Sequence, residues 1–259
     1  MNRLPESFLN RPLAHRGLHN HSEGIPENSL AAIKAAIHKG YGVEIDLQLS
    51  ADGRAMVFHD GEMERMTGMQ GCIREWTAKR LNGIYLNGGC EQIPAFAEVL
   101  DIVQGQIPLL IELKDQHGMM GMTCGTLEQA VAAALEHYWG PTAVMSFNPN
   151  MIYLLSDIAP HLTCGLTTCS FNKPDWPAME INELDRLRNI ADYDHSTVTF
   201  ISHEASDLMS PRVAELKKAG AQILCWTVLT HEQEKVARNV AQNITFEGFL
   251  PDIPALFQA

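Results

Sequence analysis

The rest of the chain is organised around Val43-Glu44-Ile45-Asp46-Leu47, a β-type run in which two acids are set into an apolar strand. Side chains alternate between the two faces of a strand, so Glu44 and Asp46 share one face and the three apolar residues share the other. Two carboxylates on one buried face repel each other and are costly to remove from water. We therefore predict positive charge between them. A solvent-facing strand edge is the alternative, which the strongly apolar flanks disfavour.

The rest of the chain alternates between short apolar strands and helices. Examples are a helix predicted over residues 30–39 and a buried strand over 107–113. Such alternation indicates a parallel sheet covered by helices. We count about eight strands, and roughly 250 residues is the usual size of a closed (β/α)8 TIM barrel. An open doubly wound sheet is less favoured because no Gly-x-Gly-x-x-Gly run follows the first strand.

One segment, residues 61–92, interrupts this alternation. It is rich in Gly, Met and Asn and carries no long periodic element. Because it is too long for an ordinary loop, we predict a small inserted subdomain or lid. The chain has 259 residues, 46% of them hydrophobic, which suits one large core. We therefore expect a single catalytic barrel domain over 1–259 with a subdomain inserted at about 61–92.

Composition excludes several classes of protein. The formal net charge is −12 and no Lys/Arg cluster is present, so nucleic-acid binding is not expected. Residues 1–12 lack the apolar core of a secretory signal, and no apolar run approaches membrane-spanning length, which predicts a cytoplasmic protein. Six cysteines are dispersed, and the one close pair, Cys164 and Cys169, lacks the Cys-x-x-Cys spacing. We expect reduced, mostly buried thiols.

In a (β/α) barrel the chemistry lies at the C-terminal ends of the strands. Glu44, Asp46 and Glu112 would bring three carboxylates from two strands to one rim. Ligation by oxygen alone is what hard cations prefer, so the sequence favours Mg²⁺ or Ca²⁺ over zinc. The polar residues and aromatic residues at the predicted strand ends are His15-Arg16, Glu44-x-Asp46, His59, Glu112-x-Lys114, Ser146-Phe147 and Trp226.

Two histidines, His15 and His59, stand at strand ends on either side of this acidic cluster. Imidazole titrates near neutrality, so one ring can take a proton while the other gives one. Arg16 and Lys114 put fixed positive charge on the same rim, which suits a phosphate-like group. Arg16 could equally neutralise the carboxylates without a substrate. Trp226 is interpreted either as core or as a wall against an organic substrate.

A different barrel hydrolase remains an alternative. His19-x-His21 resembles a metal-binding pair, as in a zinc amidohydrolase-like site, but it is expected in a mobile loop beyond Gly17. Later strand-end histidines are missing, which disfavours this alternative. The remaining histidines fall on predicted helices or loops without partners at ligand spacing.

Taken together, these motifs resemble the glycerophosphodiester phosphodiesterase family. Any one motif is weak, but in this order and spacing they are specific. Residues 170–196 match poorly, and Leu229 stands where the family often has Asn. The matching pieces are His15-Arg16-Gly17, Pro26-Glu27-Asn28-Ser29, Glu44-Ile45-Asp46, Asp52-Gly53, Val57-Phe58-His59-Asp60, Glu64-Arg65-Met66-Thr67, Ile93-Pro94, Ile111-Glu112-Leu113-Lys114, Ser146-Phe147, Trp226-Thr227-Val228 and Glu247-Gly248-Phe249-Leu250-Pro251-Asp252.

The resemblance implies a (β/α) barrel with a small insertion after the third strand. It also implies a site whose divalent cation is held by three acids, with Glu27 as a further candidate ligand. His15 and His59 would be the acid/base pair. The implied metal ligands are Glu44, Asp46 and Glu112, and the implied phosphate-binding residues are Arg16 and Lys114.

The implied reaction cleaves a glycerophosphodiester, a small-molecule substrate, to an alcohol and glycerol 3-phosphate. One histidine would activate the attacking oxygen, either water or the neighbouring glycerol hydroxyl, and the other would protonate the leaving alkoxide. The sequence leaves open which histidine does which. A non-catalytic phosphodiester-binding protein is the alternative, but retention of both histidines and all three acids argues against it.

Overall fold

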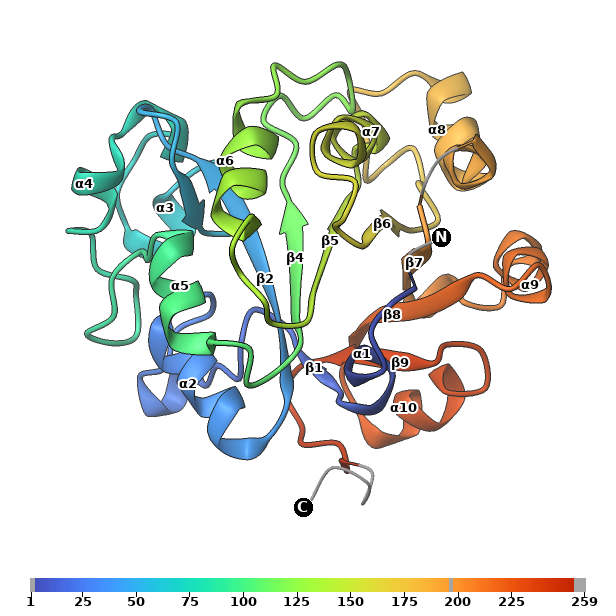
Figure 1. Ribbon diagram of the computed structural model, residues 1–259, viewed down its shortest axis with the longest axis horizontal. Coiled ribbons are helices and arrows are strands. Elements are labelled where there is room, and N and C mark those ends of the chain that lie inside the picture. The colour runs from blue at the N-terminus through green and yellow to red at the C-terminus, as the bar shows by residue number, and fades with distance from the viewer. Residues whose placement is uncertain (1–2, 196–197, 254–259) are drawn as a thin grey trace.

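A closed parallel barrel forms the body of the molecule (Figure 1). The computed structural model describes residues 3–195 and 198–253. Within them, eight strands run parallel, and β1 pairs with both β2 and β9, which closes the sheet. The predicted TIM barrel is confirmed. Its strands are β1 (Leu13–Ala14), β2 (Gly42–Leu49), β4 (Leu109–Leu113), β5 (Thr142–Ser146), β6 (Cys164–Thr168), β7 (Phe200–Glu204), β8 (Gln222–Val228) and β9 (Asn243–Phe246).

Helices connect the strands on the outside of the barrel. The predicted helix at 30–39 is α2, which begins after Ser29, whose hydroxyl accepts a hydrogen bond from the Ala32 amide, and ends at Gly40 with a left-handed φ of 79°. The other long helices follow their strands as expected, and their bounds are α2 (Leu30–Lys39), α5 (Phe96–Val103), α6 (Thr126–Leu135), α7 (Pro149–Ile158), α8 (Ile181–Arg188), α9 (Pro211–Lys218) and α10 (His231–Ala237).

A further strand, β3 (Ala55–Val57), pairs antiparallel with β2. The turn between them is closed by Ser50, whose amide donates to the Arg54 carbonyl at 2.9 Å and whose hydroxyl donates to Asp52 at 2.8 Å. The two strands therefore form a hairpin and lie side by side. The hairpin positions His59, which lies two residues after the end of β3.

Residues 61–92 form three short helical pieces: α3 (Glu64–Thr67), η2 (Ile73–Glu75) and α4 (Ala78–Leu81). Their apolar side chains pack with each other and with β3 in a cluster separate from the barrel core. The interpretation of this segment as an inserted subdomain stays a prediction. The buried members of the cluster are Met56, Phe58, Met63, Met66, Ile73, Leu81, Ile84, Leu86 and Ile93.

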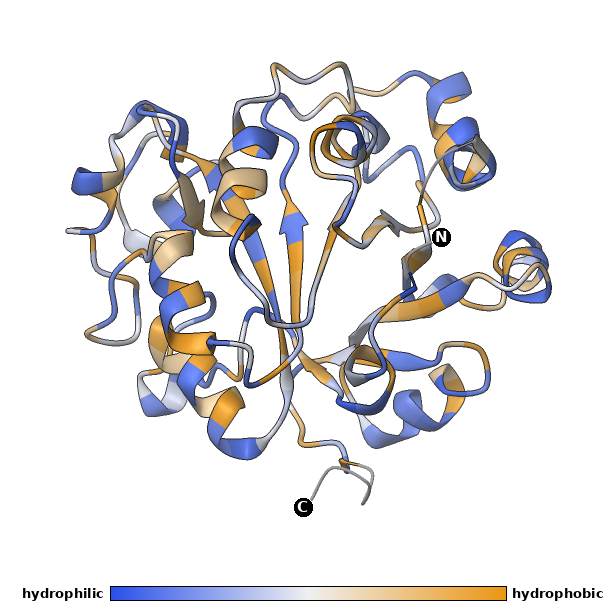
Figure 2. Cartoon of the chain, viewed as in Figure 1, coloured by the Kyte–Doolittle hydropathy of each residue, from blue (hydrophilic) through white to orange (hydrophobic). Residues whose placement is uncertain are grey.

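The lower half of the barrel is filled with apolar side chains. The short helix α1 (Ser7–Asn10) lies under it, and the fully buried ring of Phe8 packs against Leu13, Phe200 and Leu224. The side-chain amide of Asn243 holds this helix in place, because it donates a hydrogen bond to the Phe8 carbonyl at 2.7 Å. Figure 2 shows the resulting polarity along β4, which is hydrophobic along its length and hydrophilic at its tip. Polar chemistry is thereby confined to the C-terminal end of the barrel.

The buried strand predicted over 107–113 is observed as Leu109–Leu113, two residues shorter at its start. Later residues of β6 and β7 are polar but buried. The residues concerned are Thr167, Thr168, Ser202 and His203.

All six cysteines are free, as expected, but only Cys164, Cys169 and Cys225 are buried. The others lie in the insertion and in the loop after β4, where little structure covers them, so the expectation of mostly buried thiols was wrong for half of them. In the part of the chain that the structure describes, no helix is long and apolar enough to cross a membrane.

The substitution Phe8→Ala tests the role of α1. It should lower the free energy of unfolding by about 3 to 5 kcal/mol, because a fully buried phenyl ring is lost and a cavity remains. The control is Trp139→Ala, since Trp139 is 85% exposed and its loss should change stability by about 0.5 kcal/mol at most. Urea unfolding followed by circular dichroism measures both. Equal midpoints for the two variants would contradict this role.

Candidate active site

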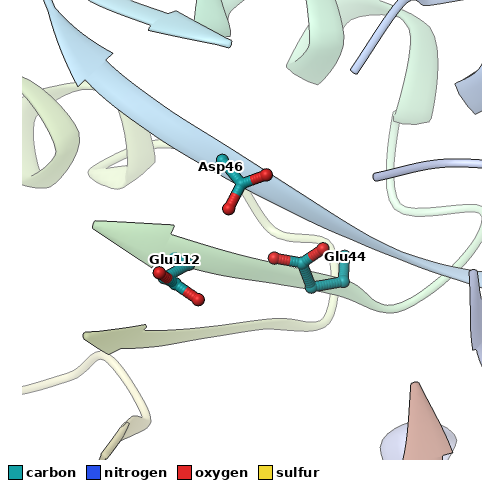
Figure 3. Close-up of side chains that lie close together, drawn as sticks. All are labelled: Glu44, Asp46 and Glu112. Carbon is teal, nitrogen blue, oxygen red and sulfur yellow. The ribbon is translucent and has the colours of Figure 1, made fainter. Parts of the chain in front are cut away.

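Three buried carboxylates meet at the C-terminal ends of β2 and β4. Asp46 lies opposite Glu112 in the register of the two strands, and Glu44 lies two residues earlier on the same face of β2. One oxygen from each of the three side chains lies within 4.8 Å of the others. Figure 3 shows the three side chains projecting from the neighbouring strands into one space. This cluster is an acidic site that could hold a metal ion.

The positive charge predicted between the acids comes from Lys114 and Arg16. The Lys114 ammonium lies 2.8 Å from Asp46 Oδ1 and 2.5 Å from Glu112 Oε1. The Arg16 guanidinium lies 3.5 Å from Asp46 Oδ2, and its backbone amide donates to Glu44 Oε2 at 3.0 Å. Asp46 also accepts a hydrogen bond of 2.8 Å from the amide of Asn28. Asp46 is thus the most fully neutralised of the three acids.

Titration of the acids follows from this unequal pairing. Burial raises the pKa of Glu44 well above its usual value, and the charges of Asp46 and Glu112 add to the effect. Burial also opposes ionisation of Asp46, but the charge of Lys114, with smaller contributions from His59 and Arg16, outweighs it and lowers the Asp46 pKa. Glu44 is therefore the acid whose ionised form lacks a strong partner.

His15 follows β1 and is held by an acid that follows β9. Its Nδ1 lies 2.7 Å from Glu247 Oε2, so Nε2 is the ring nitrogen left for the site. Burial lowers the pKa of His15, while the hydrogen bond to Glu247 opposes that shift. The Nε2 atom of His19 lies 3.6 Å from the other oxygen of Glu247, Oε1, and the His19 side chain is only 13% exposed.

The expectation that His19 is mobile was therefore wrong. Its loop is fixed at both ends by main-chain hydrogen bonds, from the Leu18 amide to the Ala32 carbonyl and between Asn20 and Ile25. His21 is exposed, and the acidic cluster that could hold a metal includes neither histidine. Among residues 3–195 and 198–253, no metal-ligand group is therefore assembled around His19-x-His21, as the zinc alternative would need.

His59 has an arrangement parallel to that of His15. Its Nδ1 lies 2.6 Å from Asp60 Oδ1, and its backbone carbonyl accepts a hydrogen bond from Gln48 at 3.0 Å. Asp60 is in turn paired with Arg65 of α3, whose Nε lies 2.6 Å from Asp60 Oδ2. Both histidines thus line the site with Nδ1 engaged by a carboxylate, and both lie beside the acidic cluster.

Glu27 lies outside the acidic cluster and between two guanidinium groups. Its Oε1 is 2.8 Å from Arg16 and 2.7 Å from Arg65. Burial opposes ionisation of Glu27, but these two arginines outweigh it and lower its pKa. The geometry makes Glu27 an anchor for Arg16 and Arg65, and its role as a further metal ligand stays a prediction.

The cluster opens into a cavity of about 140 Å³ whose remaining wall is largely apolar. Trp226 lines this cavity and also packs on Phe147, with ring centroids 5.5 Å apart, and its role as a wall against a substrate stays a prediction. Its indole nitrogen donates to the Ser202 carbonyl at 3.0 Å. The hydroxyl of Ser146 does not line the cavity. It donates a hydrogen bond to the backbone carbonyl of Leu113 at 2.7 Å.

The substitution Glu247→Gln tests the pairing of His15. A carboxylate stabilises the imidazolium form, so loss of its charge should lower the His15 pKa further. Titration of the imidazole resonances by NMR measures this shift. The control Asp207→Asn removes the partner of His203, 3.1 Å away, and should leave the His15 pKa unchanged. A His15 pKa that stays constant or rises in Glu247→Gln would rule out the pairing.

The sequence of the chain matches a known protein family. Residues 15–244 match the model of the glycerophosphoryl diester phosphodiesterase family. A glycerophosphodiester phosphodiesterase of Caldanaerobacter subterraneus subsp. tengcongensis is 26% identical over 254 residues, which cover 93% of each chain. One from Bacillus altitudinis is 28% identical over 64% of this chain and 70% of that protein.

Solved structures agree. A phosphodiesterase of Oleispira antarctica, in complex with the product sn-glycerol-3-phosphate, superposes with a TM-score of 0.72 at 25% identity and covers 93% of this chain and 94% of that one. A Thermotoga maritima glycerophosphodiester phosphodiesterase shares the fold, with a TM-score of 0.68 at 22% identity over 90% and 92% of the two chains. The predicted family and enzyme class are confirmed: the chain belongs to the glycerophosphoryl diester phosphodiesterase family.

Proposed function

We propose that the protein hydrolyses glycerophosphodiesters to an alcohol and glycerol 3-phosphate. The observation that carries the proposal is the pair of histidines, each oriented by its own carboxylate. They line the same cavity as the three acids and the positively charged side chains of Arg16 and Lys114. The product bound to the Oleispira antarctica phosphodiesterase supports glycerol phosphate as a product here.

The acidic cluster fits a divalent cation, Mg²⁺ or Ca²⁺. Its donors are oxygens alone, which hard cations prefer. Glu44 supports this assignment, because its raised pKa reflects a carboxylate that still lacks a positive partner. Glu44, Asp46 and Glu112 would hold the ion, and a bound cation supplies charge that polarises a phosphoryl oxygen.

Lys114 and Arg16 are the residues we assign to the phosphate. Both side chains line the cavity and already lie within reach of its acids, so a phosphate in the cavity would meet an ammonium and a guanidinium. Glu27 forms an ion pair with the guanidinium of Arg16 and so fixes the orientation of that side chain. The ammonium of Lys114 and the guanidinium of Arg16 would orient the diester and offset charge that develops on its oxygens.

The two histidines would move the protons. One ring accepts a proton at Nε2 from the attacking oxygen, which is water or the neighbouring glycerol hydroxyl, and the other gives one to the departing alkoxide as the phosphorus–oxygen bond breaks. Over a full turnover one water is consumed, and its oxygen ends on phosphorus. The lowered pKa of His15 favours a neutral ring, which suits the accepting role.

A grid of metals and substrates tests the proposal. After chelation the protein should release no glycerol phosphate from glycerophosphodiesters, and Mg²⁺ or Ca²⁺ should restore release. Glu44→Gln should lose this restoration because a ligand is lost, whereas Glu136→Gln, at an exposed acid after α6, should retain it. Undiminished hydrolysis after complete chelation would contradict the metal assignment.

The histidines are tested in the same assay. His15→Ala and His59→Ala should each lower kcat by about a hundredfold to ten-thousandfold, the usual contribution of a positioned acid or base. His137→Ala, at an exposed histidine, is the matched control. Circular dichroism confirms that each variant is folded. A fully active His15→Ala enzyme would sink the proposed mechanism.

A further inference from the structure

One arginine of the insertion lies between two carboxylates that come from outside it. The guanidinium of Arg65, on α3, donates hydrogen bonds to Asp60 from Nε at 2.6 Å and from Nη2 at 3.1 Å. It also donates to Glu27 from Nη2 at 2.7 Å and from Nη1 at 3.0 Å. Both oxygens of each carboxylate are engaged, so the planar guanidinium fixes the orientation of two acids at once.

Each of these two acids also holds a side chain that lines the cavity. Asp60 Oδ1 lies 2.6 Å from Nδ1 of His59. Glu27 Oε1 lies 2.8 Å from Nη1 of Arg16. His59 and Arg16 line the cavity, whereas Arg65 and the two acids do not. Arg65 is therefore one contact removed from a residue proposed to move a proton and from a residue proposed to bind the phosphate.

The other histidine of the site is held by a different acid. The Nδ1 atom of His15 lies 2.7 Å from Oε2 of Glu247, which follows β9. The four hydrogen bonds of Arg65 to carboxylates are made to the acids that orient His59 and Arg16. Loss of Arg65 should therefore disturb one histidine and leave the other in place.

The exposure of Arg65 separates orientation from folding. Its side chain is 47% exposed, and ion pairs of exposed side chains contribute little to stability. The insertion is held together by its own apolar cluster. Without the guanidinium, Asp60 is free to turn away from His59. Glu27 keeps Arg16 as its partner, pairs with it alone and draws it from the cavity.

We propose that Arg65 is a positioning residue of the active site, which holds the proton donor His59 and the phosphate-binding residue Arg16 through one acid each. This inference rests on the proposed function and assigns the donating role in it to His59. The His59 ring gives its Nε2 proton to the departing alkoxide as the phosphorus–oxygen bond breaks, while His15 takes the proton of the attacking oxygen. Arg65 itself touches neither the substrate nor the reacting atoms.

Two diesters of glycerol phosphate with different leaving groups test the proposal. The hydroxyl of choline is weakly acidic, so choline needs a proton as it departs, whereas 4-nitrophenolate is stable as an anion and leaves without one. Arg65→Ala should lower kcat for glycerophosphocholine by up to about a hundredfold, the cost of misplacing a catalytic group by about 1 Å. For the 4-nitrophenyl diester, kcat should fall by less than about threefold, because no proton donor is needed.

The second readout is phosphate binding. Both diesters carry the phosphate that Arg16 is proposed to bind, so the inhibition constant of glycerol 3-phosphate should rise in Arg65→Ala with either substrate. We expect a rise of about tenfold, the worth of one hydrogen bond to a charged group. A smaller folded fraction alone would lower the apparent kcat for both diesters equally and would leave the inhibition constant unchanged.

Arg65→Lys tests the two-pronged contacts. Lysine keeps the positive charge, but its single ammonium cannot make two parallel hydrogen bonds to each carboxylate, so this variant should behave like Arg65→Ala. Arg80→Ala is the matched control, because Arg80 lies on α4 of the same insertion and stacks over Trp76, 3.8 Å from the ring centroid. It should leave both kcat values and the inhibition constant unchanged. Circular dichroism confirms that each variant is folded.

The other outcomes are equally informative. Equal losses of kcat for the two diesters in folded Arg65→Ala, or no loss for either, would overturn the positioning role and leave the proposed function standing. An unchanged inhibition constant would overturn the link to Arg16. Unaltered kinetics in Arg65→Lys would overturn the role of the two-pronged contacts, since charge alone would then suffice. If the unaltered protein releases glycerol phosphate from neither diester at any metal, the proposed function and this inference fall together.

Discussion

The structure depends on the contact of one ammonium with two buried carboxylates. Lys114 lies between Asp46 and Glu112, on adjacent strands, and all three side chains are largely removed from water. An isolated carboxylate in such a place would cost several kcal/mol to ionise, and the pairing offsets that cost for two of the three acids. Glu44 is the remaining acid, so three carboxylates meet only two positively charged side chains, Lys114 and Arg16, and Arg16 is shared with Glu27. The proposed cation site follows from that imbalance.

The barrel separates stability from chemistry. Phe8 and its apolar neighbours fill the lower half, so the upper half can hold ionised groups without weakening the core. Around the rim, further carboxylates pair with the arginine and histidine side chains that line the cavity. Arg65 joins Glu27 to Asp60, and through them it connects the insertion to Arg16 and to His59. The insertion thus contributes to the site by orientation, although the cavity lining includes none of its residues.

Much of the site could be predicted because it is encoded locally. The two-residue period of a strand places Glu44 with Asp46 and Glu112 with Lys114, and the barrel rule places strand ends together. Glu247 was quoted as part of a motif but given no role. It follows the last strand as His15 follows the first, so the same rule could have found it, yet its pairing with His15 spans 232 positions.

Other features were hidden because the sequence does not show what tertiary contacts bury. Thr167 and Ser202 look like loop residues, but both lie inside barrel strands. His19 looked mobile until Glu247 and the fixed loop around it were seen. Arg65 carries no local signal of its role, because both of its carboxylate partners come from outside its helix.

Diffraction from crystals soaked in Mn²⁺ would locate the cation, since Mn²⁺ prefers the same oxygen ligands as Mg²⁺ and scatters anomalously. We expect one strong anomalous peak bounded by carboxylate oxygens of Glu44, Asp46 and Glu112. An empty cluster at saturating Mn²⁺, with the ion bound elsewhere, would contradict it.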